Sequence, residues 1–570
     1  MIRRIMLALL LLPGLSKAQQ FPEPHYPQNY FRNPLDIPML LAGNVGELRP
    51  GHFHSGLDIK TNGHIGMRVH AAADGYISRV GVSSTGFGNV IYISHPNGYT
   101  TLYGHLHRFN PALEQYVKKQ QYRQERWAVD LDLMPGLFPV KKGQFIAWSG
   151  STGSSVAPHL HFEIRKTVDQ HPLNGLLFGF EVRDNIPPSV YRIAVYDRDK
   201  SLYEQTPQVY SLKKSGGLYR PSLGTIRVKA ARAGFGISTI DHENGTTNTY
   251  GVYRAVVYDD DRPSVGFQLD DVGYEETRYV DAHTDYKTHH SGGPYYELLF
   301  SLPGNRLPIY HNFEGDGTVD LSDGAVHAIK IAVKDAGGNT STVSFNIQQD
   351  PAAKPEQKSP CANRMTPGIK NIFENNHVEF YLDETALYDD ICFRYKTLPA
   401  PATGYYSDIY CLHNPDVPLY TSFTLRLRPD KPVPPSLRSK MVIVRTEPRS
   451  GRHEVRAASW SGAWLEASFR DFGNFAVQAD TTPPVITPVG LHSGISLANA
   501  TRMAFRIRDG LSGIKSYRAM LDGRWLMFAQ DGSTIYYTFD EHCPRGSHRL
   551  ELTVTDEANN TATYLLTFKR

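Results

Sequence analysis

The alternating stretch at residues 159–165, HLHFEIR, constrains the N-terminal third of this chain more than any other feature. Leu160, Phe162 and Ile164 alternate with polar side chains, and this period of two predicts a β-strand whose apolar face packs into a core. The two histidines of the stretch then share the opposite face. We therefore expect two imidazoles fixed at one spot, as the binding of a metal ion or the transfer of a proton requires.

Two places upstream carry the same chemistry. The stretch GHFHSGLDIK puts His54 four residues before Asp58, and the stretch YGHLH contains His105. If the first stretch is also extended, His54 and Asp58 lie on one side with Gly56 between them, which leaves room for an ion. Two imidazole nitrogens and one carboxylate oxygen make a three-ligand zinc site with an open fourth position, the catalytic pattern. Either motif alone occurs by chance in many chains, so the prediction rests on their combination.

The segment from about residue 43 to residue 165 resembles the lysostaphin-type (LytM-like) zinc metallopeptidases, which cut peptide bonds in bacterial cell walls. The resemblance rests on five stretches in the family's order: HSGLDI, VHAAADGYI, GNVIYISHPNGYTTLYGHL, VKKGQFIAWSGSTG and PHLHFE. It implies a β-sheet peptidase domain that uses Zn²⁺ as its cofactor. The segment between His107 and the VKKG turn is longer than the compact family pattern.

Carried over residue by residue, the resemblance implies His54, Asp58 and His161 as the zinc ligands and His105 and His159 as the catalytic histidines. All five residues are present, whereas degenerate members of the family have lost ligands and serve as binding modules. The implied reaction is metal-assisted hydrolysis of an amide, in which the catalytic histidines move protons or stabilise the oxyanion. Which histidine has which task stays open at this point.

The long segment after His107 contains one predicted helix at about 111–127. Asn110 can cap this helix and Pro111 suits its first turn. Its apolar stripe consists of Leu113, Tyr116 and Val117. Two interpretations of the helix stay open, a solvated surface insertion and a lid over the zinc cleft.

The first residues, MIRRIMLALLLLPGLSKAQQ, combine two arginines, an apolar run and small residues, which is typical of a signal peptide over residues 1–18. The apolar run is shorter than the roughly 20 residues of a membrane helix, so we expect no membrane span in the mature chain. Removing three basic residues and no acid lowers the net charge from +3 to about zero, and nothing favours nucleic acid. We expect an exported protein of the periplasm or cell envelope.

At 570 residues the chain is too long for one core, and its many glycines, prolines, tyrosines and phenylalanines suit short strands joined by turns. We predict an all-β protein, with a LytM-like β-sheet peptidase domain followed by about three β-sandwich (immunoglobulin-like) domains. The predicted parts are the signal peptide at 1–18, the peptidase domain at 19–177, a sandwich with an insertion at 184–350, a linker at 351–364, a sandwich at 365–478 and a sandwich at 480–570.

An internal repeat supports the first and last of these sandwiches. HAIKIAVKDAGGNTSTVSF aligns without gaps to HRLELTVTDEANNTATYLL, which pairs Asp335 with Asp556 and Asn339 with Asn560. Both copies also open alike, on DNIPP and DTTPP, and the first copy carries about 75 extra residues. The terminal strand–turn–strand pattern resembles bacterial immunoglobulin-like domains, which are β-sandwiches.

The chain has four cysteines, Cys361, Cys392, Cys411 and Cys543, and these permit three disulfide connectivities. Three of them fall in or near the predicted middle sandwich, so at least one of the three is free or paired across domains. Export makes a disulfide feasible. The sequence does not choose among the connectivities.

The chain contains neither a G-x-S-x-G elbow nor an H-E-x-x-H helix, so serine-hydrolase and thermolysin-like mechanisms have no support. The interpretation is an exported zinc metalloendopeptidase that acts on peptide cross-links or stems of peptidoglycan, with a D-alanyl–diaminopimelate bond ahead of a glycine bridge. The sandwiches would offer a surface to an envelope protein partner. Two alternatives stay open: a non-catalytic wall-binding or amidase-activating module, and a structural adhesin with a vestigial peptidase.

Overall fold

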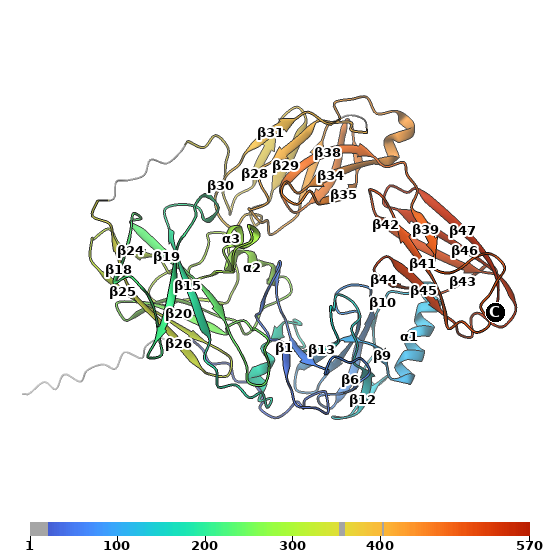
Figure 1. The fold of residues 1–570 in the computed structure, drawn as a ribbon, viewed down its shortest axis with the longest axis horizontal. Helices are drawn as coiled ribbons and strands as arrows, with labels where there is room; N and C mark the ends of the chain where they lie inside the picture. Colours follow the sequence, from blue (N-terminus) through green and yellow to red (C-terminus); the bar gives the residue numbers. More distant parts are fainter. Residues whose placement is uncertain (1–20, 353–359, 402–403) are drawn as a thin grey trace, which may run out of the picture.

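The computed structural model describes residues 21–352, 360–401 and 404–570, so the predicted signal peptide lies outside the described residues. Within them β-strands far outnumber helices, which confirms the all-β prediction. The sheets form four groups along the chain, arranged as a ring in which the blue N-terminal part meets the red C-terminal part (Figure 1). No helix of the described residues is long and apolar enough to cross a membrane.

The first group is a nine-stranded sheet with the order β1-β4-β13-β8-β7-β6-β10, while β11 pairs with β6 and β14 with β13. Its strands are β1 (Leu41–Gly43), β4 (Leu57–Lys60), β6 (Gly75–Val82), β7 (Asn89–Ser94), β8 (Tyr99–Leu106), β10 (Val129–Asp132), β11 (Pro139–Val140), β13 (His159–Lys166) and β14 (Pro172–Leu173). A smaller sheet consists of β5 (Arg68–His70), β12 (Phe145–Trp148) and β9 (Arg108–Phe109).

Strand β13 has the two faces that its alternation predicts. Leu160, Phe162 and Ile164 are fully buried in the core of the first domain. Burying each of these side chains stabilises the fold by about 1.5–3 kcal/mol, so the register of β13 is firmly fixed. The strand lies between β4 and β8, where His161 is opposite Asp58 on one side and Gly104 on the other.

The predicted helix is present as α1 (Pro111–Gln124), and its start is capped as expected. The side chain of Asn110 accepts a hydrogen bond of 3.1 Å from the backbone N–H of Leu113. Leu113 and Val117 are buried in the core of the first domain, and Tyr116 packs edge-on against Phe138. The stripe predicted from sequence is therefore the face that holds the helix to its own domain.

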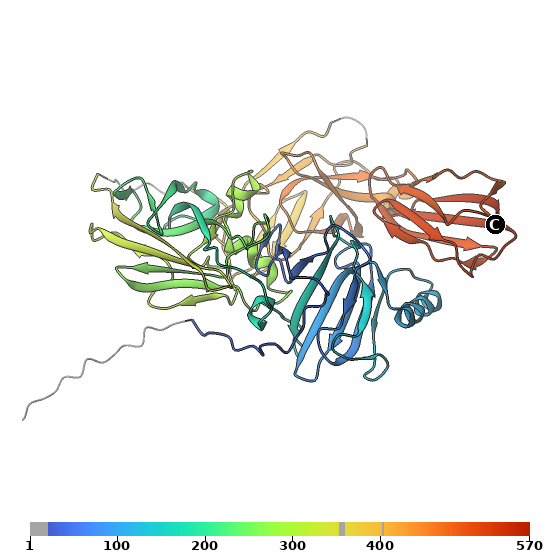
Figure 2. The same ribbon diagram turned by 60° about the horizontal axis from the view of Figure 1, so that its bottom comes forward.

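The outer face of α1 meets the C-terminal domain, and the two lie side by side in both views (Figures 1 and 2). Lys118 Nζ lies 2.8 Å from Asp540 and 2.8 Å from Glu541. The ring of Tyr122 stacks on His542 with centroids 3.6 Å apart. These contacts close the ring of domains, and they involve only the insertion that the compact family pattern lacks.

The second domain is one continuous twelve-stranded sheet, in which β16 pairs with both β15 and β17. Its longer strands are β15 (Ser189–Asp197), β16 (Gln208–Ser215), β17 (Leu218–Pro221), β19 (Arg232–Ile240), β20 (Arg254–Asp259), β21 (Arg262–Gln268), β25 (His327–Lys334) and β26 (Thr340–Gln349). The third domain has two five-stranded sheets, β28-β29-β33-β37-β36 and β31-β32-β38-β34-β35. Its strands are β28 (Asn371–Glu374), β29 (Val378–Leu382), β31 (Tyr395–Leu398), β32 (Ile409–Leu412), β33 (Phe423–Leu427), β34 (Met441–Thr446), β35 (His453–Ala457), β36 (Ser459–Ser461), β37 (Trp464–Phe469) and β38 (Gly473–Ala479).

The second and third domains share one continuous hydrophobic core, which the sequence did not predict. Tyr388 of the third domain is fully buried and donates its hydroxyl to the carbonyl oxygen of Arg278 in the second. The predicted linker at 351–364 falls mainly on residues 353–359, which lie outside the described residues, and its last residue already begins strand β27 (Arg364–Met365). Packing, rather than the linker, therefore fixes how these two domains sit together.

The C-terminal domain packs a four-stranded sheet, β39-β41-β45-β44, against a five-stranded one, β40-β47-β46-β42-β43. Its strands are β39 (Val485–Pro488), β40 (Ile495–Ser496), β41 (Arg502–Arg508), β42 (Ile514–Leu521), β43 (Arg524–Trp525), β44 (Ala529–Asp531), β45 (Thr534–Thr538), β46 (Ser547–Asp556) and β47 (Thr561–Lys569). The cysteine connectivity that the sequence left open is settled by a disulfide between Cys361 and Cys392. Cys411 and Cys543 are free.

The contact between α1 and the C-terminal domain predicts that one charge reversal opens the ring. Lys118→Glu sets a carboxylate against Asp540 and Glu541, and the repulsion should separate the two domains. Small-angle scattering at low salt should then report a larger radius of gyration. Lys119→Glu on the exposed side of the same helix is the matched control. Unchanged scattering for Lys118→Glu would show that the ring does not depend on this contact.

Candidate metal centre

Three side chains that the sequence singled out converge at one point in the first domain. His54 Nε2 lies 3.1 Å from Asp58 Oδ1 and 3.1 Å from His161 Nδ1. His161 Nδ1 lies 2.8 Å from the same Asp58 oxygen. All three residues are buried, with exposed fractions of 3–4%. One donor atom from each residue could therefore hold a metal ion.

Strand pairing positions two of these donors, and the absence of a side chain at Gly56 permits the third. Asp58 in β4 is directly opposite His161 in β13. A Cβ atom at Gly56 would lie 2.7 Å from the carbonyl oxygen of Phe162 and 2.8 Å from His161 Nε2. Gly56 thus lets the chain approach β13 closely on its way from His54 to Asp58. The sequence argument assigned this space to an ion, but the neighbouring strand fills it.

The hydrogen bonds behind the cluster define which atoms face it. His54 Nδ1 lies 2.7 Å from the carbonyl oxygen of Asn44, which can only accept, so the proton is on Nδ1 and Nε2 presents a lone pair. His161 Nε2 lies 2.8 Å from Glu163 Oε1 and donates to it in the same way, which leaves Nδ1 as the inward atom. His54 Nε2, His161 Nδ1 and one oxygen of Asp58 then face one another.

This donor set fits a divalent metal ion. Burial opposes a charge on His161, but hydrogen bonds to Asp58 and Glu163 outweigh it and raise the pKa of the imidazole to about 9. Burial likewise opposes the charge on Asp58, and the three surrounding histidines hold its pKa well below its usual range. The environment therefore favours positive charge at the centre, and nitrogen and oxygen donors of this kind are those that zinc prefers.

His105 and His159 lie beside the cluster, and their ring centroids are 4.8 Å apart. Both point a lone pair toward the site, because the Nδ1 atoms donate to the carbonyl oxygens of Thr152 and Ala157 at 2.8 Å each. Burial, followed by the positive potential of His161 and His159, lowers the pKa of His105 to about 4. His105 is therefore neutral near pH 7 and able to accept a proton.

The backbone of His105 is in the left-handed region, with a φ of 57°. Such a conformation is uncommon for a residue other than glycine and clusters at functional sites. The backbone N–H of His105 donates to the carbonyl oxygen of Phe87 at 2.8 Å, and the side chain bonds to Thr152 on the opposite side. The fold thus fixes this histidine at the end of β8.

Three residues missed from sequence support the cluster from behind. Glu163 accepts hydrogen bonds from Ser55 (2.8 Å), Arg165 (2.6 Å) and Tyr274 (2.7 Å) as well as from His161. The period of two along β13 could have identified Glu163 and Arg165, which lie two and four residues after His161. Tyr274 comes from the second domain, so no local sequence signal could have placed it there.

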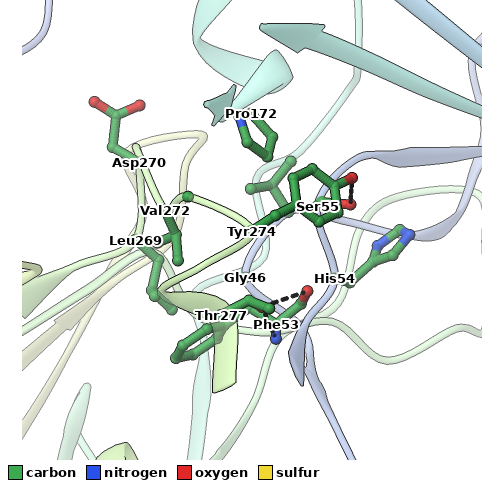
Figure 3. A pocket seen from close by; sticks show the side chains of 12 residues that line it. Gly46, Phe53, His54, Ser55, Pro172, Leu269, Asp270, Val272, Tyr274 and Thr277 are labelled. Carbon is green, nitrogen blue, oxygen red and sulfur yellow. Dashed lines mark hydrogen bonds between the residues drawn. The ribbon is translucent and has the colours of Figure 1, made fainter. Parts of the chain in front are cut away.

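The second domain therefore forms one wall beside the cluster. Figure 3 shows Tyr274 next to Ser55, with His54 adjacent, in a pocket whose other walls include Leu269 and Thr277. The hydroxyl oxygens of Tyr274 and Ser55 are 3.0 Å apart. His54 lines this pocket and belongs to the cluster, so the second domain packs directly beside the cluster.

A second hollow, an open groove, lies over β6 and β7 and includes Phe87, whose ring is 5.2 Å from that of His161. It is also lined by Arg79, Tyr92, Gln124 and Arg126. The C-terminal end of α1 thus borders this groove while its outer face meets the C-terminal domain. The lid interpretation of the helix stays a prediction.

His52 and His107 are exposed and do not join the cluster.

Comparisons with known proteins agree with this geometry. Residues 52–122 match the Peptidase family M23, and residues 362–480 match the Zu5-like domain. DD-carboxypeptidase/endopeptidase Mpg of Neisseria meningitidis is 33% identical over 127 residues, which are 22% of this chain and 23% of Mpg. Lysostaphin of Staphylococcus staphylolyticus is 36% identical over 114 residues, which are 20% of this chain and 18% of lysostaphin.

A solved structure of the lysostaphin catalytic domain from Staphylococcus simulans is similar at 32% identity with a TM-score of 0.16. The match covers 21% of this chain and 76% of that domain. This chain spans less than a quarter of the length of the two curated relatives. The similarity thus concerns one domain, which is of the LytM/lysostaphin type, and the remaining sheets lie outside these matches apart from the Zu5-like domain.

The support behind His161 yields a prediction about metal affinity. Glu163→Gln keeps the shape of the side chain but removes the charge that orients and polarises the imidazole, so Zn²⁺ affinity should fall by about 10- to 100-fold. Competition with a chromophoric chelator measures this change, and exposed Glu181→Gln is the control. Equal affinity in Glu163→Gln and the unaltered protein would remove Glu163 from the description of the site.

Proposed function

Because residues 52–122 belong to a peptidase family M23 domain, we propose that this protein is an exported zinc metalloendopeptidase that hydrolyses peptide bonds of peptidoglycan. The observation that carries the proposal is the convergence of His54, Asp58 and His161 donor atoms within about 3 Å of one another, beside two further histidines. The name of Mpg, a DD-carboxypeptidase/endopeptidase, supports a peptide substrate.

In this proposal His54 Nε2, Asp58 Oδ1 and His161 Nδ1 hold the zinc ion. A zinc ion bound by three protein ligands supplies a Lewis acid that polarises a carbonyl group and makes water a stronger nucleophile near neutral pH. Asn44 and Glu163 fix the orientations of the two imidazoles through hydrogen bonds. Arg49 donates a hydrogen bond of 3.1 Å to the second oxygen of Asp58 and helps to orient that carboxylate.

His105 and His159 move the protons of the reaction. Hydrolysis transfers a hydroxyl group to the carbonyl carbon and a proton to the leaving amine, so one base and one acid are required. His105 is neutral and exposes Nε2, which suits the base. His159 Nε2 lies 3.3 Å from Asp58 Oδ1, on the side of the cluster where it can carry the second proton transfer.

The peptide would lie in the groove that passes Phe87 and Tyr92. Arg126 lines this groove, and its positive charge suits a carboxylate of a peptidoglycan stem peptide, whereas Arg79 is paired with Asp130 in the same groove. The sandwiches beyond the groove would contact the wall or an envelope protein.

One prediction from this proposal concerns the metal ion and the activity together. The mature protein should contain about one zinc ion and release muropeptides from purified sacculi, and a chelator should abolish this release until zinc is restored. His54→Ala and Asp58→Ala should each lose tight zinc binding and activity, because two protein ligands are too few. Exposed His52→Ala is the control and should keep both. Release of muropeptides by zinc-free protein would contradict the proposal.

Another prediction distinguishes the proposed zinc ligand His161 from the proposed proton carrier His159 on the same strand. His159→Ala should keep its zinc, because three protein ligands remain, yet lose turnover by about 10²- to 10⁴-fold. His161→Ala should lose zinc and turnover together. Zinc counted per folded chain, with the same muropeptide substrate for both variants, gives the comparison. Zinc loss in His159→Ala with zinc retained in His161→Ala would reverse the two assignments.

A further inference from the structure

Three carboxylates meet at the point where the second domain begins. Asp184 lies in the segment before β15, Asp241 directly follows β19, and Asp335 directly follows β25. One side-chain oxygen of each lies within 4.8 Å of the others. The cluster thus joins the segment that leaves the peptidase domain to two turns of the next domain.

The C-terminal domain repeats this arrangement with different residues. Asp480 lies in the segment before β39, Asp509 directly follows β41, and Asp556 ends β46. Their side-chain oxygens also lie within 4.8 Å of one another. The internal repeat pairs the first and third members of the two clusters, and the structure adds the second pair. The same three positions therefore carry aspartate in both domains.

Backbone and amide groups orient these carboxylates in the same way in both domains. Asn339 donates from its backbone and side chain to Asp335 at 2.8 and 2.9 Å, and Asn560 does so to Asp556 at 2.7 and 2.8 Å. Asp480 accepts a hydrogen bond of 3.0 Å from the backbone N–H of Ser512. These hydrogen bonds hold the carboxylates of Asp335, Asp556 and Asp480 in fixed orientations.

Buried polar atoms at both clusters have no hydrogen-bond partner among the described residues. Asp241 is only 2% exposed, and its Oδ1 atom is unpartnered. In the other cluster Asp509 Oδ1 and the hydroxyl of Ser512, a residue 7% exposed, are unpartnered as well. Buried carboxylate oxygens that no donor reaches are costly, which indicates that a cation belongs there.

We propose that each cluster binds one divalent cation of the Ca²⁺ class. The donors are all hard oxygen atoms, without the imidazole or thiolate that would favour zinc or copper. Three carboxylates supply a net charge that one Ca²⁺ largely offsets, and backbone carbonyls and water complete its shell in such sites. Bound Ca²⁺ would clamp each domain to the segment that precedes it, and so fix the angles at two joints of the ring.

Calcium titration of the full mature chain, in buffer freed of divalent ions, tests this proposal. We expect two Ca²⁺ per chain with Kd on the order of 10⁻⁴ to 10⁻³ M, the range of extracellular modules, and weaker binding of Mg²⁺. Asp241→Asn and Asp509→Asn should each remove one Ca²⁺, and the double variant both. These substitutions keep the side-chain shape and spare the bonds from Asn339 and Asn560. Asp260→Asn, which is exposed and outside both clusters, should retain two.

Thermal unfolding gives a second test, because a cluster that binds no calcium would show no calcium-dependent change in Tm. Calcium should raise the Tm of the unaltered protein and leave that of the double variant unchanged. Without calcium the double variant should melt at or above the unaltered protein, because it lacks the repulsion. No Ca²⁺ bound by the unaltered chain up to about 10 mM, or two Ca²⁺ retained by the double variant, would overturn the proposal. Equal binding of Mg²⁺ would overturn the calcium class.

Discussion

The pairing of β4 with β13 is the constraint on which the metal centre depends. It sets Asp58 opposite His161, while the apolar residues of β13 hold the register by their burial. A shift of one residue would turn His159 and His161 into the core and bring Leu160 to the surface. The energy that fixes the ligands is thus that of ordinary core packing. His54 reaches the same point because glycine at position 56 lets the chain pass close to β13.

The other domains are linked to this centre by packing contacts between segments that lie far apart in the sequence. Tyr274 of the second domain bonds to Glu163, which in turn bonds to the proposed ligand His161. The second domain shares its core with the third, and the last domain returns to helix α1 of the first. In the proposed function, a closed ring of this kind would limit how a cross-linked polymer reaches the metal centre. The angle at each joint therefore matters for access, and the two aspartate clusters lie at two of these joints.

Much of the first domain could be predicted from the sequence, because its signals are local. The period of two in β13, the cap at Asn110 and the spacing from His54 to Asp58 each reflect backbone geometry over a few residues. The clustering of His54, Asp58 and His161 followed from a family resemblance, and the geometry agrees with it. Tyr274, the shared core and the contact of α1 with the last domain depend on how distant segments pack, and one sequence carries no local signal for that. The repeat likewise revealed Asp335 and Asp556 as equivalent, but not that Asp241 and Asp509 complete the two clusters.

Diffraction at the zinc absorption edge tests the central claim most directly, because it locates the metal without reference to activity. We expect one anomalous peak in crystals of the mature protein, about 2.0–2.2 Å from His54 Nε2, Asp58 Oδ1 and His161 Nδ1. His105 and His159 should lie outside the bonding distance. A peak bound by His159 in place of His161, or no peak at this cluster in zinc-loaded protein, would contradict the account.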